Sequence, residues 1–144
     1  MDERITCDKM KMKLQKITKP GKEILRLYNE FNYKDKKKRI GKFRTRRIIF
    51  SAKVDKKTVG FILANFIDYG MESFGYIEEL YVDKEFRNKK IGRTLVQKTL
   101  NEFKKLKVSA VHVTTNRRNK KAQLLYQRAG FEKDKNPWYN YWFR

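Results

Sequence analysis

Two adjacent carboxylates, Glu78 and Glu79, interrupt the otherwise apolar segment GYIEELYV at residues 75–82. A carboxylate held in such a segment can accept a proton as a general base, although an unpaired one is more often a surface group. Tyr126 carries a hydroxyl that could serve a leaving group. Its helical spacing with Ala122 and Leu125 is equally typical of a half-buried packing residue. Because strand side chains alternate between faces, we expect only one of the two glutamates to face a cleft.

A basic turn follows this segment. Arg87, Lys89, Lys90 and Arg93 surround Gly92, where a helix is predicted to begin. A helix N-terminus already carries partial positive charge, so positive side chains there oppose it unless an anion is bound. Free amides at a helix start bind phosphate oxygens, and a glycine lets the backbone approach them closely. The turn therefore predicts either a phosphate-bearing ligand or a solvated basic surface.

The length of 144 residues indicates one domain, residues 1–144, and 40% hydrophobic residues suffice for a core. No apolar run approaches the ~20 residues of a membrane span, and the charged start lacks the pattern of a secretory signal. Cys7 is the only cysteine and His112 the only histidine, so we expect no disulfide, no metal site and a reducing cytoplasm.

The net charge of +21 attracts polyanions such as nucleic acid, phosphate-bearing cofactors or acidic proteins. Biased composition explains such a total equally well. The densest cluster is Lys34–Arg47, with nine basic residues and one acidic residue, and it is predicted to be a loop or a solvated helix end.

Hydrophobic periodicity predicts the elements that carry these groups. Strands are expected at about 10–18, 48–54, 58–67, 75–82, 109–115 and 138–143, and helices from Pro20, at about 92–107 and at 119–130. Residues 55–57 form a hairpin turn between the second and third strands, and Gly130 closes the last helix. This order predicts a mixed α/β sheet with helices on both faces.

Two segments in this order resemble the signatures of the GNAT superfamily of N-acetyltransferases. LYVDKEFRNKKIGRTL resembles the acyl-CoA pyrophosphate loop, whose pattern is Arg/Gln-x-x-Gly-x-Gly/Ala, and NKKAQLLYQRAGF resembles the second signature. Arg87 takes the first motif position and Gly92 the last, whereas Lys90 replaces the first glycine. The resemblance implies a central, mostly antiparallel sheet with a splayed strand pair that holds acetyl-CoA.

The resemblance also implies roles for single residues. Amides from about Asn88 to Arg93 would bind the pyrophosphate, and the main chain around Leu80 and Val82 would pair with pantetheine. Glu78 would be the general base and Tyr126 would serve the thiolate. Asn119 would cap its helix, contact pantetheine, or do both. The implied cofactor-binding set is Leu80, Tyr81, Val82, Arg87, Asn88, Lys89, Lys90, Ile91, Gly92, Arg93, Asn119 and Tyr126.

The resemblance thus predicts acetyl transfer from acetyl-CoA to a primary amine of a small molecule, protein or peptide, by direct attack without metal. The basic cluster favours an acceptor of acidic character. An alternative is a nucleic-acid-binding or ribosome-associated module without catalysis, supported by the charge and the aromatic content. A CoA-binding regulator is a third reading, against which both Glu78 and Tyr126 argue. No membrane partner is expected, and the oligomeric state stays open, a homodimer included.

Overall fold

The computed structural model describes residues 3–7, 10–14, 16, 21–31, 43–70 and 72–135. It divides into two compact units, Met1–Lys42 and Phe43–Arg144. The expectation of a single domain stays a prediction. In the first unit, β1 (Glu3–Cys7) and β2 (Met10–Leu14) form an antiparallel hairpin. The sequence predicted only the second of these strands, and Leu14 ends it earlier than expected.

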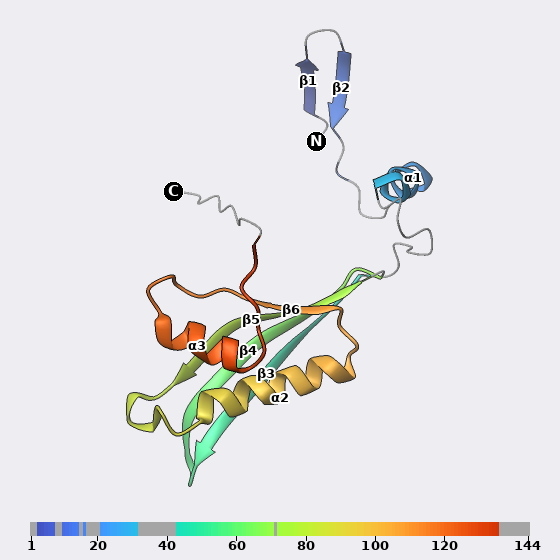
Figure 1. Ribbon diagram of the computed structural model, residues 1–144. Helices are drawn as coiled ribbons and strands as arrows, with labels where there is room; N and C mark the ends of the chain where they lie inside the picture. Colours follow the sequence, from blue (N-terminus) through green and yellow to red (C-terminus); the bar gives the residue numbers. More distant parts are fainter. Residues whose placement is uncertain are drawn as a thin grey trace. The chain divides into compact units, whose positions relative to one another are not determined.

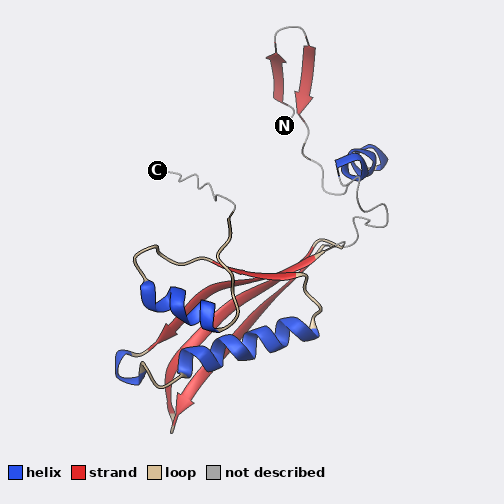
Figure 2. Ribbon diagram, viewed as in Figure 1, coloured by secondary structure: helices blue, strands red, loops and turns tan. Residues whose placement is uncertain are grey.

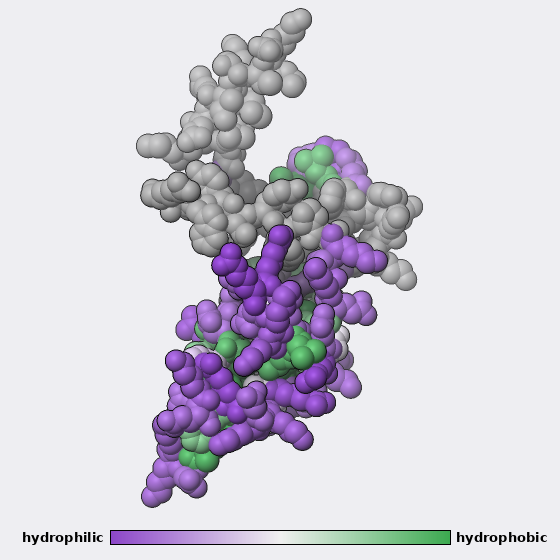
Figure 3. Space-filling view, turned by 60° about the vertical axis from the view of Figure 1, so that its left-hand side comes forward, coloured by the Kyte–Doolittle hydropathy of each residue, from purple (hydrophilic) through white to green (hydrophobic). Residues whose placement is uncertain are grey.

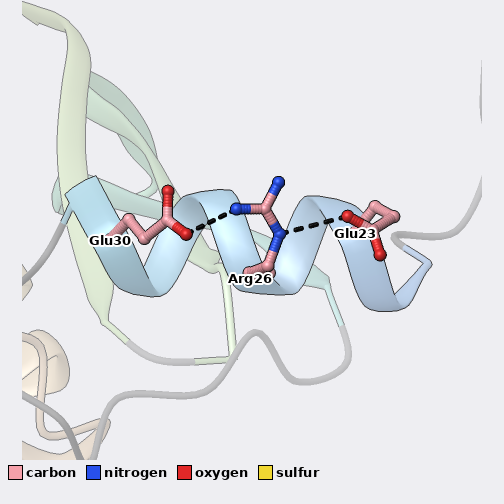
Figure 4. Close-up of polar contacts among 3 residues, drawn as sticks. All are labelled: Glu23, Arg26 and Glu30. Atoms are coloured by element: carbon pink, nitrogen blue, oxygen red, sulfur yellow. Dashed lines mark hydrogen bonds and ion pairs between the residues drawn. The ribbon is translucent and has the colours of Figure 1, made fainter.

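The helix α1 (Lys22–Phe31) completes the first unit. Arg26 lies between two carboxylates, each about one helical turn away, and donates to Glu23 at 3.1 Å and to Glu30 (Figure 4). All three side chains are more than half exposed. Each of these pairs therefore adds only a few tenths of a kcal/mol, about 0.2–0.5, to helix stability.

In the described part of the second unit, four strands form a sheet in the order β3-β4-β5-β6. The strands are drawn in red in Figure 2. The strands are β3 (Arg44–Val54), β4 (Lys57–Asp68), β5 (Ser73–Val82) and β6 (Ala110–Val113). The first three are antiparallel, and β6 runs parallel to β5. Asp55, with a φ of 54°, begins the two-residue turn between β3 and β4. The predicted hairpin and the mixed sheet are confirmed.

The end of the basic segment Lys34–Arg47 is not a loop, contrary to our expectation. Residues 44–47 are the first four of β3 and pair with residues 65–68 of β4. Arg44 donates to Asp68 through Nε at 2.9 Å, and the carboxylate also accepts from the Gly70 amide. That amide and Arg44 together lower the pKa of Asp68. Residues 44–47 therefore form a strand through pairing with β4, although their charge pattern predicted a loop. Residues 34–42 lie outside the described part.

Two helices, α2 (Ile91–Lys105) and α3 (Lys120–Arg128), cover one face of this sheet (Figure 1). A short 3₁₀ turn, η1 (Lys84–Phe86), lies in the connection from β5 to α2. The core beneath the helices consists of Ile48, Ile62, Ala64, Phe66, Ile77, Leu95, Val96, Phe103 and Tyr126. Gly130, with a φ of +96°, ends α3 as predicted. The strand predicted at 138–143 lies outside the described residues.

Hydrophilic side chains cover most of the visible surface of the second unit, with small hydrophobic areas between them (Figure 3). Among the described residues, no helix has the length and apolar character needed to cross a membrane. Nor do the described His, Cys, Asp and Glu residues form a group of three that could hold a metal ion.

Gly75 in β5 makes room for the ring of Phe103, which is fully buried. A Cβ at Gly75 would lie 2.7 Å from the Cε2 and Cζ atoms of this ring. We therefore expect Gly75→Ala to lower the free energy of unfolding by about 1–3 kcal/mol, as overpacked cores do. Urea denaturation measures it, with Gly21→Ala as the control because a Cβ at Gly21 would have no atom within 4 Å. Equal stability of both variants would show that the ring yields freely.

Candidate active site

The second half of β5 has an open edge. β6 pairs with Phe74–Ile77 and ends at Val113, whereas β4 pairs with β5 as far as Val82. In the described part of the chain, residues 79–82 of β5 therefore have a strand partner on one side only (Figure 1). Such an edge presents backbone N–H and C=O groups that can pair with an extended ligand.

A β-bulge lies at the beginning of this open edge. Leu63 pairs with Glu79 and Ala64 pairs with Ile77, so Glu78 is the extra residue. Ile77 is buried in the core beneath the helices, and Leu80 packs against the same core. Strict alternation across residues 77–80 is therefore broken, and both glutamates lie exposed between two residues of the helix-covered face. The bulge removes the regular alternation on which our expectation of opposite faces was based, and the facing of Glu78 and Glu79 stays a prediction.

The two glutamates have different neighbours. Asn65 of β4 donates from Nδ2 to Oε1 of Glu78 at 3.2 Å. Asn65 alternates with the buried Ala64 and Phe66, so this contact lies on the face away from the helices. Glu79 instead acts on Tyr126 of α3. Burial raises the pKa of Tyr126, and the negative charge of Glu79 raises it further.

Tyr126 belongs both to the hydrophobic core and to the candidate active site. Its ring is buried and packs edge-on against Phe131 at 5.6 Å between centroids. Within the described part of the chain, its hydroxyl makes no hydrogen bond and is not sealed from solvent. Packing thus holds the ring, and the hydroxyl is available to a ligand. The two readings of Tyr126 from sequence are compatible.

Two residues in the loop between β5 and α2 have a left-handed backbone, which glycine adopts most easily. Lys90, which replaces the first glycine of the pattern, is in the left-handed region with a φ of 63°, and Asn88 has a φ of 62°. That conformation costs a non-glycine residue about 1 kcal/mol. Lys90 is the N-cap of α2, so the amides of the first turn have no partner within the helix. Lys89, Lys90 and Arg93 are exposed around them. These groups fit a phosphate-bearing cofactor.

Gly92 serves the packing of two helices, and Asn119 caps a helix. A Cβ at Gly92 would lie 3.1 Å from Cδ1 of Leu125, so this glycine lets α2 approach α3. Asn119 caps α3, since its Oδ1 accepts from the Ala122 amide at 3.0 Å, which confirms the predicted N-cap. The pantetheine contact of Asn119 stays a prediction.

The remaining residues of the implied set lie along the open edge. Leu80 and Val82 face α2, because a Cβ at Gly92 would come within 3.9 Å of each side chain. Tyr81 is exposed and pairs with Phe61, with 6.3 Å between ring centroids. Arg87 donates from Nε to the Val82 carbonyl at 2.9 Å.

Sequence reasoning missed Asn65 as the partner of Glu78, because a contact across strands depends on register. It also missed the effect of Glu79 on Tyr126. His112 packs its ring against Phe74 and Tyr76, at 5.6 and 5.2 Å between centroids.

The two sequence signatures implied a mixed sheet that opens between two parallel strands, beside a basic loop at a helix start. The described part of the chain has this arrangement. Residues 16–131 match the model of the Acetyltransferase (GNAT) family. The match covers most of the chain, which therefore belongs to this family.

Individual relatives agree with this assignment. N-alpha-acetyltransferase 30 from Dictyostelium discoideum is 32% identical over 88 residues, which are 61% of this chain and 48% of that protein. The chain spans about half or less of the length of the curated relatives it matches.

Among solved structures, an aminoglycoside acetyltransferase from an uncultured soil metagenomic sample has a TM-score of 0.62 at 18% identity, covering 83% of this chain and 86% of that one. AAC(6')-Iy, solved with the bisubstrate analogue CoA-S-monomethyl-acetylneamine, has a TM-score of 0.57 at 20% identity and covers 67% of this chain and 70% of that one. At these identities, the likeness shows the fold.

Proposed function

We propose that this protein transfers an acetyl group from acetyl-CoA to a primary amine. The observation that carries the proposal is the open edge of β5, with the carboxylate of Glu78 at one end and the first-turn amides of α2 at the other. Two kinds of ligand group fit these ends, an amine that must lose a proton and a phosphate. A structural relative solved with a CoA-containing bisubstrate analogue supports the same cofactor.

The residues that hold acetyl-CoA in this proposal follow the edge in order. The main chain of Leu80, Tyr81 and Val82 pairs with pantetheine, and the amides of the loop after Arg87, from Asn88 to Arg93, bind the pyrophosphate. Asn119 lies beyond them at the start of α3. When bound, acetyl-CoA supplies an activated thioester.

The chain's own groups then act on the acceptor. An ammonium has no lone pair, so the acceptor must first lose a proton, and Glu78 accepts it directly or through water. The amide of Leu80 donates to the oxygen on which negative charge develops. Tyr126 donates to the sulfur that leaves, while Asn65 holds the Glu78 carboxylate on the acceptor side. Neither a metal nor a covalent enzyme intermediate takes part.

An acidic acceptor remains our preferred class, on the strength of the net charge. The structure reduces one argument for it, because Arg44 at the end of the basic cluster is already paired with Asp68. The names of similar proteins give different acceptors, namely an alpha-amino group, D-amino acids and aminoglycosides. Family membership disfavours the alternative of a nucleic-acid-binding module. A cytoplasmic location stays a prediction.

We expect acetyl-CoA at 100 times its Kd to stabilise the protein by about 2.7 kcal/mol, because it binds the folded state alone. Thermal denaturation with and without acetyl-CoA measures this, and desulfo-analogues or free adenine serve as controls for the nucleotide part. Release of free CoA with a panel of amines, amino acids and peptides then tests transfer. An unchanged melting temperature at saturating acetyl-CoA would contradict the proposal.

A further inference from the structure

The guanidinium of Arg87 lies beside the ring of Tyr81. Leu80 and Val82 face α2, where Gly92 approaches them. Tyr81 lies between these two residues in the strand, so its ring projects to the other face. The Arg87 Cζ atom is 5.7 Å from the centroid of the Tyr81 ring. The guanidinium thus lies beside Tyr81, whereas Gly92 of the first turn of α2 lies beside Leu80 and Val82.

The hydrogen bond of Arg87 is made on the open edge. Its Nε donates to the carbonyl oxygen of Val82 at 2.9 Å. The Asp83 amide, in the same peptide unit, donates to the Val59 carbonyl of β4 at 2.8 Å. Because N–H and C=O of a trans peptide point in opposite directions, the Val82 carbonyl points away from β4. Arg87 thus reaches back from the loop to the last acceptor on the open edge.

We propose that Arg87 is a positioning residue whose side chain ties the loop at residues 83–90 to the end of β5, and that its charge does not bind phosphate. The inference rests on the proposed acetyl transfer. The family pattern accepts Arg or Gln at this position, and both donate from a planar nitrogen, whereas only Arg is charged. The property that Arg and Gln share is the ability to donate a hydrogen bond such as the one to the Val82 carbonyl. The Val82 oxygen retains a second lone pair for a ligand.

Two substitutions separate the hydrogen bond from the charge. Arg87→Gln removes the charge and keeps a donor, and Arg87→Met removes both. Arg93→Gln is the matched control, because it removes one charge from the first turn of α2. Titration calorimetry gives the Kd of coenzyme A at low and high salt, and thermal denaturation of the ligand-free proteins gives the melting temperatures.

We expect Arg87→Met to weaken coenzyme A binding about tenfold, the effect of losing one hydrogen bond to a charged donor, and Arg87→Gln to stay within about threefold of wild type. Without ligand, the Met variant should melt several degrees lower and the Gln variant should not, since about 1 kcal/mol shifts a domain of this size by roughly 3–6 °C. Both should keep the wild-type salt dependence, whereas Arg93→Gln should flatten it.

Equal weakening by Gln and Met, with a flatter salt dependence in both, would show that the charge binds phosphate and would overturn the proposal. So would an Arg87→Met variant with unchanged Kd and melting temperature. If coenzyme A does not bind the wild type, the proposed function fails instead. The ligand-free melting temperatures then decide about Arg87: a Met variant below the Gln variant supports the tie, and equal values refute it.

Discussion

Tyr126→Phe should lower kcat about 100-fold and change the KM for acetyl-CoA less than threefold, a loss of about 2.7 kcal/mol that is confined to the transition state. The hydroxyl makes no hydrogen bond within the described part of the chain, so the fold does not depend on it. Burial and the charge of Glu79 raise the pKa of Tyr126 above that of an ordinary tyrosine. A thiol ionises at about 8.5, so in the proposed reaction we expect this phenol to keep its proton and to donate a hydrogen bond to the leaving thiolate.

Steady-state kinetics with varied acetyl-CoA separate kcat from KM, and thermal denaturation checks folding. The phenylalanine ring should retain the edge-on contact with Phe131. Tyr69→Phe is the matched control, because Tyr69 is exposed and pairs with Phe43 and Phe74 away from Glu78 and Glu79. An unchanged kcat in a folded Tyr126→Phe protein would make Tyr126 a packing residue only.

Glu78→Gln should lower kcat/KM about 100-fold at neutral pH, whereas Glu79→Gln should cost less than about fivefold. The side-chain amide that Glu78→Gln introduces could still contact Asn65 but could not accept the proton of the acceptor. Glu79 has another effect. Its charge helps to raise the pKa of Tyr126, so its removal lowers that pKa. The loss of kcat at high pH, where the phenol ionises, should therefore begin at a lower pH in Glu79→Gln.

The pH profiles of kcat and kcat/KM for both variants provide the measurement, with Glu85→Gln, an exposed carboxylate in η1, as the charge control. The reverse ranking would make Glu79 the base. Small, equal effects would mean that water or the acceptor itself carries the proton. Both carboxylates are exposed on the strand, so their exposure does not decide between them.

Elements of the second unit were predictable because their signals are local. Alternation in residues 48–67 and helical spacing in residues 91–128 identify strands and helices without knowledge of their partners. Contacts between strands were not predictable. The bulge at Glu78 depends on how β5 aligns with β4, and residues 44–47 join β3 because β4 pairs with them. The same limit applies to the site. The sequence motifs identified the loop, but the hydrogen bond of Arg87 to the Val82 carbonyl depends on the direction in which that peptide group points.

The ring of Phe103 in the space left by Gly75 has a consequence for the far end of α2. Phe103 lies twelve residues after the helix start, a length of about 18 Å. At the other end, Gly92 approaches Leu80, Val82 and Leu125. Close packing thus fixes α2 at both ends. If α2 moved by one residue along β5, the ring of Phe103 would clash with a side chain. A single aromatic ring at the far end of the helix therefore sets the position of α2 along β5, and with it the position of the first-turn amides at the open edge.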